Sequence, residues 1–202
     1  MDITPKKINQ IQPPIVGRGE IRKRQKPVTM NKATILLTIP AILCLFCACA
    51  EERKETEFYL VRHAEKEVWT NPDTTVTYNP GLSEEGIARA DKFKELMADK
   101  EVEVIYSTEY DRNMGTVLPL AEYAGIEIKN YHWYEWQDML DEIEREHLGA
   151  TIVICGHGDN LLPIVSALGG TPPQDSLGDH EYDKIFHLIK KRDSTYTQTI
   201  VF

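Results

Sequence analysis

The sequence lacks a disulfide framework. Three of its four cysteines, Cys44, Cys47 and Cys49, lie in one short apolar run, and Cys155 stands alone in a predicted core strand. This spacing lacks the second pair of ligands that a zinc site needs, so Cys155 is predicted to pack in the core. Internal repeats and low-complexity segments are also missing, and the 202 residues allow one well-packed domain with a short appendage.

Positive charge is scarce outside the N-terminal segment. The whole chain carries a formal net charge of −9, but residues 1–48 carry +6, so the remaining residues carry −15. A nucleic-acid-binding protein needs a basic surface to neutralise backbone phosphates, and an acidic domain repels anionic lipid headgroups as well. We therefore expect no nucleic-acid partner, and any phosphate that the domain binds must meet a small local cluster of positive groups.

Residues 30–50 have the order of a signal peptide. A basic start at Met30 precedes the apolar stretch 33–46, which small residues and an abruptly charged segment follow. Phe46-Cys47-Ala48-Cys49 resembles the lipobox of a bacterial lipoprotein, with Phe where a smaller aliphatic residue is usual. The signal peptide is therefore expected to span 30–48, leaving Cys49 as the lipidated residue of a tether over 49–56.

Two alternatives remain for this N-terminal part. Residues 33–50 are about as long as a transmembrane helix needs to be, so they could stay as an uncleaved anchor. Residues 1–29 lack a hydrophobic pattern. Either they are translated and disordered, or they result from a start codon assigned too far upstream, and Met30 is the true initiator. Each alternative places the domain outside the cytosol, held at the bacterial cell envelope by its N-terminal anchor.

Hydrophobic patterns over residues 57–202 predict strands that alternate with helices. Strands are expected at 58–61, 102–106, 126–129 and 151–155, helices at 83–100, 112–123, 135–147 and 160–168, and a terminal hairpin at 184–189 and 195–201. This alternation is typical of an α/β sandwich of three layers with a mostly parallel central sheet.

Two arginines and two histidines fall at the predicted strand ends: Arg62, His63, Arg112 and His157. Ligands of open parallel sheets bind at the carboxyl ends of the strands. Guanidinium groups match phosphoryl oxygens in pairs, so the four side chains would form a phosphoryl pocket. A neutral imidazole can attack phosphorus and form a phosphohistidine, and fixed cations stabilise the charge on the equatorial oxygens. Such chemistry requires no metal and no cofactor, and a metal beside two arginines is electrostatically disfavoured.

Three separated segments resemble the histidine phosphatase superfamily. Its hallmark Arg-His pair after the first strand is similar to Leu60-Val61-Arg62-His63-Ala64-Glu65. Its second-arginine segment is similar to Tyr106-Ser107-Thr108 with Arg112 and Thr116, and its second-histidine segment to Ile154-Cys155-Gly156-His157-Gly158. The resemblance spans about residues 57–201 and implies a phosphoglycerate mutase-like fold. The short distance from Arg112 to His157 looks most like the small phosphohistidine-phosphatase-like branch.

This resemblance implies a role for each motif residue. His63 would be the nucleophile, and Arg62 and Arg112 would bind phosphate. His157 would complete the pocket, and Ser107 would be a further substrate ligand. The implied activity is hydrolysis of a phosphomonoester. Two alternatives are a catalytically idle phosphate-binding lipoprotein of the same fold and a phosphomutase.

The general acid is the least defined part of the site. Superfamily members often place an acidic residue between the second arginine and the second histidine, where this chain has Glu135 and Asp138. Glu65 and Asp159 lie close to motif residues too, and Glu135 is favoured. The aromatic segment 132–136 either lines the substrate mouth or packs on the core. The address outside the cytosol favours a phosphorylated small molecule as substrate, whereas the resembled branch favours a phosphoprotein.

Overall fold

The computed structural model describes residues 54–68 and 78–202, and the predicted elements follow one another there in the predicted order. They are β1 (Thr56–Arg62), α2 (Glu84–Met97), β2 (Val104–Ser107), α3 (Asp111–Ala124), β3 (Ile128–Asn130), α4 (Trp136–Glu146), β4 (Thr151–Gly156), α5 (Leu161–Ala167), β5 (Lys184–Lys190) and β6 (Thr195–Val201). The predictions for residues 1–48 and for Cys49 lie outside these ranges. Within them, no helix has the length and apolar character needed to cross a membrane.

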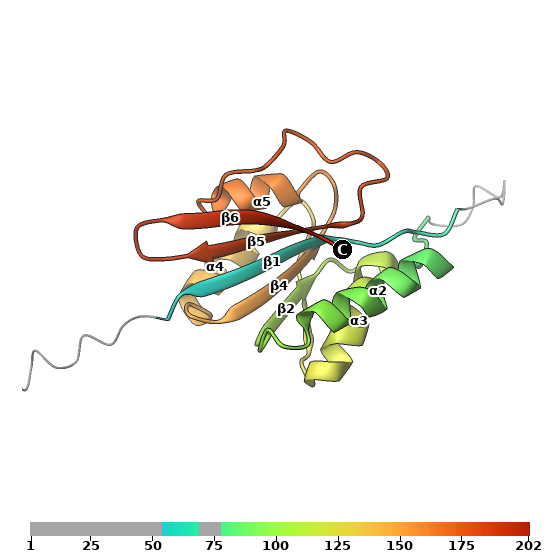
Figure 1. Ribbon diagram of the computed structural model, residues 1–202, viewed down its shortest axis with the longest axis horizontal. Coiled ribbons are helices and arrows are strands. Elements are labelled where there is room, and N and C mark those ends of the chain that lie inside the picture. Colours follow the sequence, from blue (N-terminus) through green and yellow to red (C-terminus); the bar gives the residue numbers. More distant parts are fainter. Residues whose placement is uncertain (1–53, 69–77) are drawn as a thin grey trace, which may run out of the picture. The chain divides into compact units, whose positions relative to one another are not determined.

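One sheet runs through the domain, with its strands in the order β3-β2-β4-β1-β5-β6 (Figure 1). The strands β1 to β4 pair in parallel, whereas β5 runs antiparallel to β1 and forms a hairpin with β6. Apolar runs predicted the parallel strands because a strand that is covered on both faces needs no polar side. The predicted three-layer α/β sandwich with a mostly parallel central sheet is confirmed.

Alternation along β1 divides the core between the two faces of the sheet. Phe58 and Leu60 pack with residues of α4 and α5, whereas Tyr59 and Val61 pack with residues of α2 and α3. All four side chains are at most 3% exposed. Burial of one such side chain contributes roughly 1.5–3 kcal/mol. The central strand therefore holds both helical layers in place.

Several predicted boundaries shift by up to three residues. β2 covers Val104–Ser107 rather than 102–106, because Val102 is only half-buried and stays outside the sheet. α2 ends at Met97 rather than near residue 100. Gly125 ends α3 as predicted, with a left-handed φ of 68° that glycine adopts without strain.

The segment after β1 passes directly against the N-terminus of α2. Ser83 caps this helix as predicted, since its hydroxyl accepts a hydrogen bond from the N–H of Gly86 at 3.2 Å. The Ser83 N–H donates to the Glu65 carbonyl oxygen at 2.9 Å. A Cβ at position 86 would lie 2.1 Å from that oxygen, so only glycine permits this approach. The contact sets the course of the chain immediately after the Arg62-His63 pair.

Candidate active site

Parallel strands bring the four predicted pocket residues to one edge of the sheet. β1 ends at Arg62, which lies opposite Gly156 at the end of β4. His63 and His157 follow these two strand ends, and their rings lie 5.5 Å apart, edge to face. Arg112 stands in the first turn of α3, after a short loop that begins at the end of β2.

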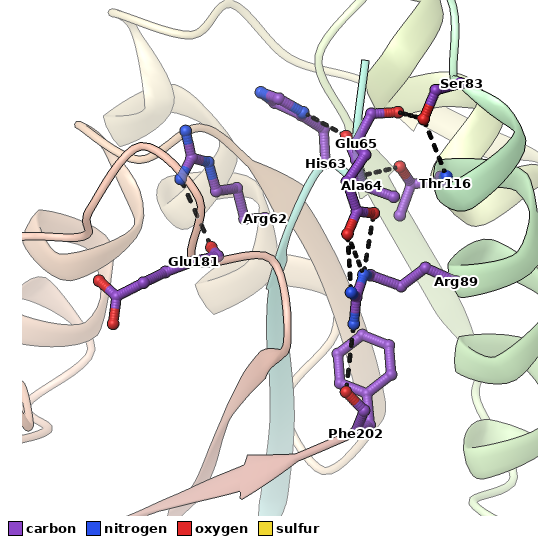
Figure 2. A network of polar contacts seen from close by, with 10 residues as sticks. Arg62, His63, Ala64, Glu65, Ser83, Arg89, Thr116, Glu181 and Phe202 are labelled. Atoms are coloured by element: carbon purple, nitrogen blue, oxygen red, sulfur yellow. Dashed lines mark hydrogen bonds and ion pairs between the residues drawn. The ribbon is translucent and has the colours of Figure 1, made fainter. Parts of the chain in front are cut away.

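His63 is a buried imidazole in a defined tautomer. Its Nδ1 lies 2.8 Å from the carbonyl oxygen of Ala64 (Figure 2), and because a carbonyl only accepts, Nδ1 carries the proton. The lone pair is then on Nε2. Burial is the main cause that lowers the pKa of His63 to about 3. The hydrogen bond with Ala64 is the next largest effect and opposes it, whereas the charges of Arg112 and, more weakly, Arg62 lower the pKa further. The ring is neutral at pH 7, as a nucleophile must be.

His157 is also held neutral and in a fixed position. Its Nε2 lies 3.0 Å from the hydroxyl of Thr108, and its main-chain N–H donates to Oδ1 of Asn160 at 2.8 Å. Burial first, and then the charge of Arg112, lowers the pKa of His157 to about 4, while Asp159 acts in the opposite direction. The second histidine therefore adds no positive charge to the pocket at neutral pH.

The two pocket arginines have no carboxylate partner in the part of the chain that the structure describes. No ion pair among residues 54–68 and 78–202 includes Arg62 or Arg112. The Arg112 guanidinium lies 4.5 Å from the ring centre of Tyr110, and its buried Nε lacks a hydrogen-bond partner. Arg62 donates only to main-chain oxygens, and its Nε is likewise buried and unpaired. Since a buried donor without a hydrogen-bond partner costs free energy, the Nε–H groups of these two half-buried arginines indicate a site that an anion would complete.

Ser107 and Thr108, at the end of the second strand, make different hydrogen bonds. The Ser107 hydroxyl is fully buried and donates to the carbonyl oxygen of Thr108 at 3.0 Å. Thr108, rather than Ser107, contacts His157. The role of Ser107 as a substrate ligand stays a prediction.

Glu65 faces away from the histidines. Figure 2 shows its carboxylate turned toward Arg89, which binds it through Nε and Nη2 at 2.7 to 2.9 Å. Arg89 also donates to the main-chain oxygen of Phe202 at 3.1 Å. Burial raises the pKa of Glu65, but the hydrogen bonds and charge of Arg89 outweigh it, so the pKa lies below the ordinary value. Glu65 is ionised at neutral pH and is a poor proton donor.

Glu135 and Asp138, the predicted acids of the intervening segment, are both exposed at the start of α4. In the described ranges, neither side chain has a hydrogen bond or ion pair with a pocket residue. Asp159 lies two residues after His157 and acts electrostatically on it. Glu135 as general acid therefore stays a prediction, with Asp159 as the alternative that the geometry places beside the pocket.

The aromatic segment 132–136 has one tryptophan near His157 and one packed on the core, while its role at a substrate mouth stays a prediction. The Trp133 ring stands edge-on to the His157 ring, with the ring centres 6.4 Å apart. The main-chain oxygen of Trp133 accepts a hydrogen bond from Nδ2 of Asn160 at 3.1 Å. Trp136 instead packs against the hydrophobic core. Trp133 thus lies beside the pocket, and Trp136 anchors the segment.

The sequence analysis missed the supporting residue Asn113 and named Thr116 without giving it a role. The Asn113 side chain donates to the Gly156 carbonyl oxygen at 2.9 Å. The hydroxyl of Thr116 accepts from the N–H of Ala64 at 2.9 Å (Figure 2) and donates to the carbonyl oxygen of Arg112 at 2.7 Å. A polar residue directly after Arg112, in a helix with one buried face, was the available signal for Asn113.

One group away from the pocket has spacing suited to a metal ion. In the described part of the chain, it consists of Glu142, Glu146 and His147. The Lys129 ammonium lies among them, bonded to Glu142 and 3.2 Å from Nε2 of His147. The positive charge of the lysine disfavours binding of a metal cation at the same place, so we do not assign a metal site to this group.

Comparison with protein families found a match over part of the chain. The model of the histidine phosphatase superfamily (branch 1) matches residues 58–137, a segment that contains Arg62, His63 and Arg112 and ends before His157. A search of curated proteins found no match.

Solved structures share the fold at low sequence identity. A candidate phosphohistidine phosphatase, SixA from Agrobacterium tumefaciens, has a TM-score of 0.56 at 19% identity, over 72% of this chain and 98% of its own. A mycobacterial glucosyl-3-phosphoglycerate phosphatase has 0.54 at 12%, over 72% and 97%. The protein histidine phosphatase SixA in complex with tungstate has 0.54 at 12%, over 72% and 96%. These likenesses show the fold, and the predicted phosphoglycerate mutase-like architecture is confirmed.

We expect the His63 imidazole to remain neutral well below pH 6. Its lowered pKa, about 3, means that protonation is complete only below that pH. NMR titration of the histidine Cε1–H signals, with His63→Asn to assign the peak, should show no shift of the His63 signal between about pH 8 and 5. The control is the urea-unfolded chain, where histidine titrates near 6.5. A folded-state midpoint at or above pH 6 for His63 would contradict the assigned environment.

Proposed function

We propose that this chain is a member of the histidine phosphatase superfamily that hydrolyses phosphomonoesters through a phosphohistidine on His63. The observation that carries the proposal is the pair of guanidinium groups that have no carboxylate partner among the described residues and lie beside a neutral, oriented imidazole. The family match over residues 58–137 and the phosphatase names of the structural neighbours support it.

The proposed reaction has two displacements at phosphorus. Nε2 of His63 attacks phosphorus, and the N–P bond forms as the P–O bond to the leaving group breaks. The leaving oxygen takes a proton from the general acid. In the second displacement the same carboxylate, now a base, takes a proton from water, whose oxygen attacks phosphorus and releases His63 and orthophosphate. Arg62 and Arg112 stabilise the charge on the equatorial oxygens throughout, and neither step uses a metal or cofactor.

Trapping the intermediate tests this mechanism directly. Rapid quenching of the protein with para-nitrophenyl phosphate should give an acid-labile, base-stable phosphoryl adduct on His63, together with released nitrophenol. Loss of a covalent nucleophile removes most of the rate, so His63→Ala should lower kcat by more than about 10³-fold and abolish the adduct. The matched control is His147→Ala, a histidine that follows α4 and contacts Lys129.

Two outcomes would overturn the proposal of a hydrolase. If the folded protein binds orthophosphate but forms no adduct and shows no turnover, it is the catalytically idle phosphate-binding protein. An adduct whose phosphoryl group passes to a sugar phosphate rather than to water would be a phosphomutase.

We propose Glu135 as the general acid, because it follows Trp133 in the segment beside the pocket. Glu135→Gln should slow hydrolysis of an alkyl phosphate, whose leaving oxygen needs a proton, by about 10²–10⁴-fold. Hydrolysis of para-nitrophenyl phosphate should change far less, because nitrophenolate leaves without a proton. Asp138→Asn is the matched control from the first turn of α4. If Asp159→Asn slows hydrolysis of the alkyl phosphate much more than that of para-nitrophenyl phosphate, and Glu135→Gln does not, the general acid is Asp159.

We also propose that the domain acts at the bacterial envelope on phosphorylated small molecules. The signal-peptide order of residues 30–48 supports this location, and a lipid anchor supplies the membrane contact that a domain of net charge −15 cannot. A substrate outside the cytosol is more readily a scavenged phosphoester than a cytosolic phosphoprotein.

Metabolic labelling with a radioactive fatty acid tests the anchor. The wild-type protein and the matched variant Cys47→Ser should incorporate label, and Cys49→Ser should not. Unlabelled membrane-bound protein that retains residues 30–48 would instead establish an uncleaved transmembrane anchor.

A further inference from the structure

The loop between α5 and β5 reaches Arg62 across more than a hundred residues of sequence. Nη1 of Arg62 donates to the main-chain oxygens of Gly178, at 2.7 Å, and Glu181, at 3.4 Å. The ring of Tyr182 lies over the same guanidinium, with Cζ 4.6 Å from the ring centre, and 5.8 Å from the ring of His63. This loop therefore contacts both a phosphate-binding arginine and the nucleophile.

These contacts leave one edge of the Arg62 guanidinium for a ligand. The loop carbonyls occupy Nη1, whereas Nε is buried and unpaired. Gly158 lies against the group, since a Cβ there would be 3.4 Å from Cζ and 3.6 Å from both Nε and Nη2; as a glycine, it places no side chain against these two donors. Nε and Nη2 are the parallel donors that bind two oxygens of one phosphoryl group. By holding Nη1, the loop determines where this donor pair points.

The carboxylate of Glu181 organises the loop from its other side. Figure 2 shows this side chain directed away from Arg62, while its main-chain oxygen accepts from the guanidinium. The carboxylate accepts from the N–H of Gly178, from Nε2 of Gln174 at 3.1 Å, and from the ammonium of Lys184. The Gly178 residue is thus held at its N–H by Glu181 and at its carbonyl oxygen by Arg62.

We propose that Glu181 is a positioning residue of the phosphatase site. Its carboxylate holds the loop so that the carbonyl oxygens of Gly178 and Glu181 present the Nε–Nη2 edge of Arg62 to the phosphoryl group. The inference rests on the function proposed above. Without this carboxylate, the Gly178 residue loses its anchor, and the long Arg62 side chain has to be ordered when phosphate binds. Phosphate affinity falls, while the attack by His63 on bound substrate changes less.

Two single variants distinguish the positioning effect of Glu181 from the general effect of removing a negative charge near the site. Asp179 is exposed in the same loop and has no side-chain hydrogen bond or ion pair in the described ranges, so Asp179→Ala is the matched control. Glu181→Ala should raise KM for para-nitrophenyl phosphate and the calorimetric Kd of orthophosphate about 10- to 100-fold, with a smaller change in kcat. Asp179→Ala should change each by no more than about twofold. Glu181→Gln keeps an acceptor for Gly178 and should recover part of the affinity.

A double-mutant cycle tests whether Glu181 acts through Arg62. In an Arg62→Ala background, Glu181→Ala should change the orthophosphate Kd by no more than about twofold, because the side chain that it positions is gone. An equal factor in both backgrounds, or equal losses in Glu181→Ala and Asp179→Ala, would overturn the inference. Absence of turnover in the wild-type protein would instead count against the proposed function, and the orthophosphate series would still test the role of Glu181.

Discussion

The candidate site depends on one main-chain oxygen, that of Gly156 at the end of β4. It accepts from the N–H of His63 at 3.0 Å and from the side chain of Asn113 at 2.9 Å. One acceptor thus joins the three segments that carry the Arg-His pair, the second arginine and the second histidine. A side chain at position 156 is excluded, because its Cβ would lie 2.6 Å from Oδ1 of Asn160, which holds the N–H of His157. Losing a partner from such a buried network costs about 1–3 kcal/mol.

The meeting of the motif residues was predictable from sequence, for a physical reason. Strands such as β4 are apolar throughout and buried on both faces, so their hydrophobic runs locate them well. Parallel strands end at one edge of a sheet, and a short polar motif after each apolar run therefore marks that edge. Arg62, His63 and His157 follow from this pattern alone. Arg112 follows because a short loop joins β2 to its helix.

The polar contacts that support the site were not predictable, because they join segments that are distant in sequence and share no common pattern. Glu181 was indistinguishable from a solvated loop carboxylate, and its effect on Arg62 passes through a peptide group rather than a side chain. The ion pair of Glu65 with Arg89 requires knowing that α2 packs against the segment after β1. Without that contact, Glu65 remained a candidate for the general acid, behind Glu135, by its position in the motif.

The cations of the pocket have two connected effects on its histidines. Arg62 and Arg112 add to burial in lowering the pKa of His63, so the groups proposed to bind phosphate also keep the proposed nucleophile unprotonated. If a phosphoryl dianion binds there as proposed, it would offset these same charges and, by linkage, raise the affinity of both imidazoles for a proton. In the proposed phosphatase, two arginines would thus both bind the dianion and influence the protonation of the histidines beside it, within a domain that is acidic as a whole.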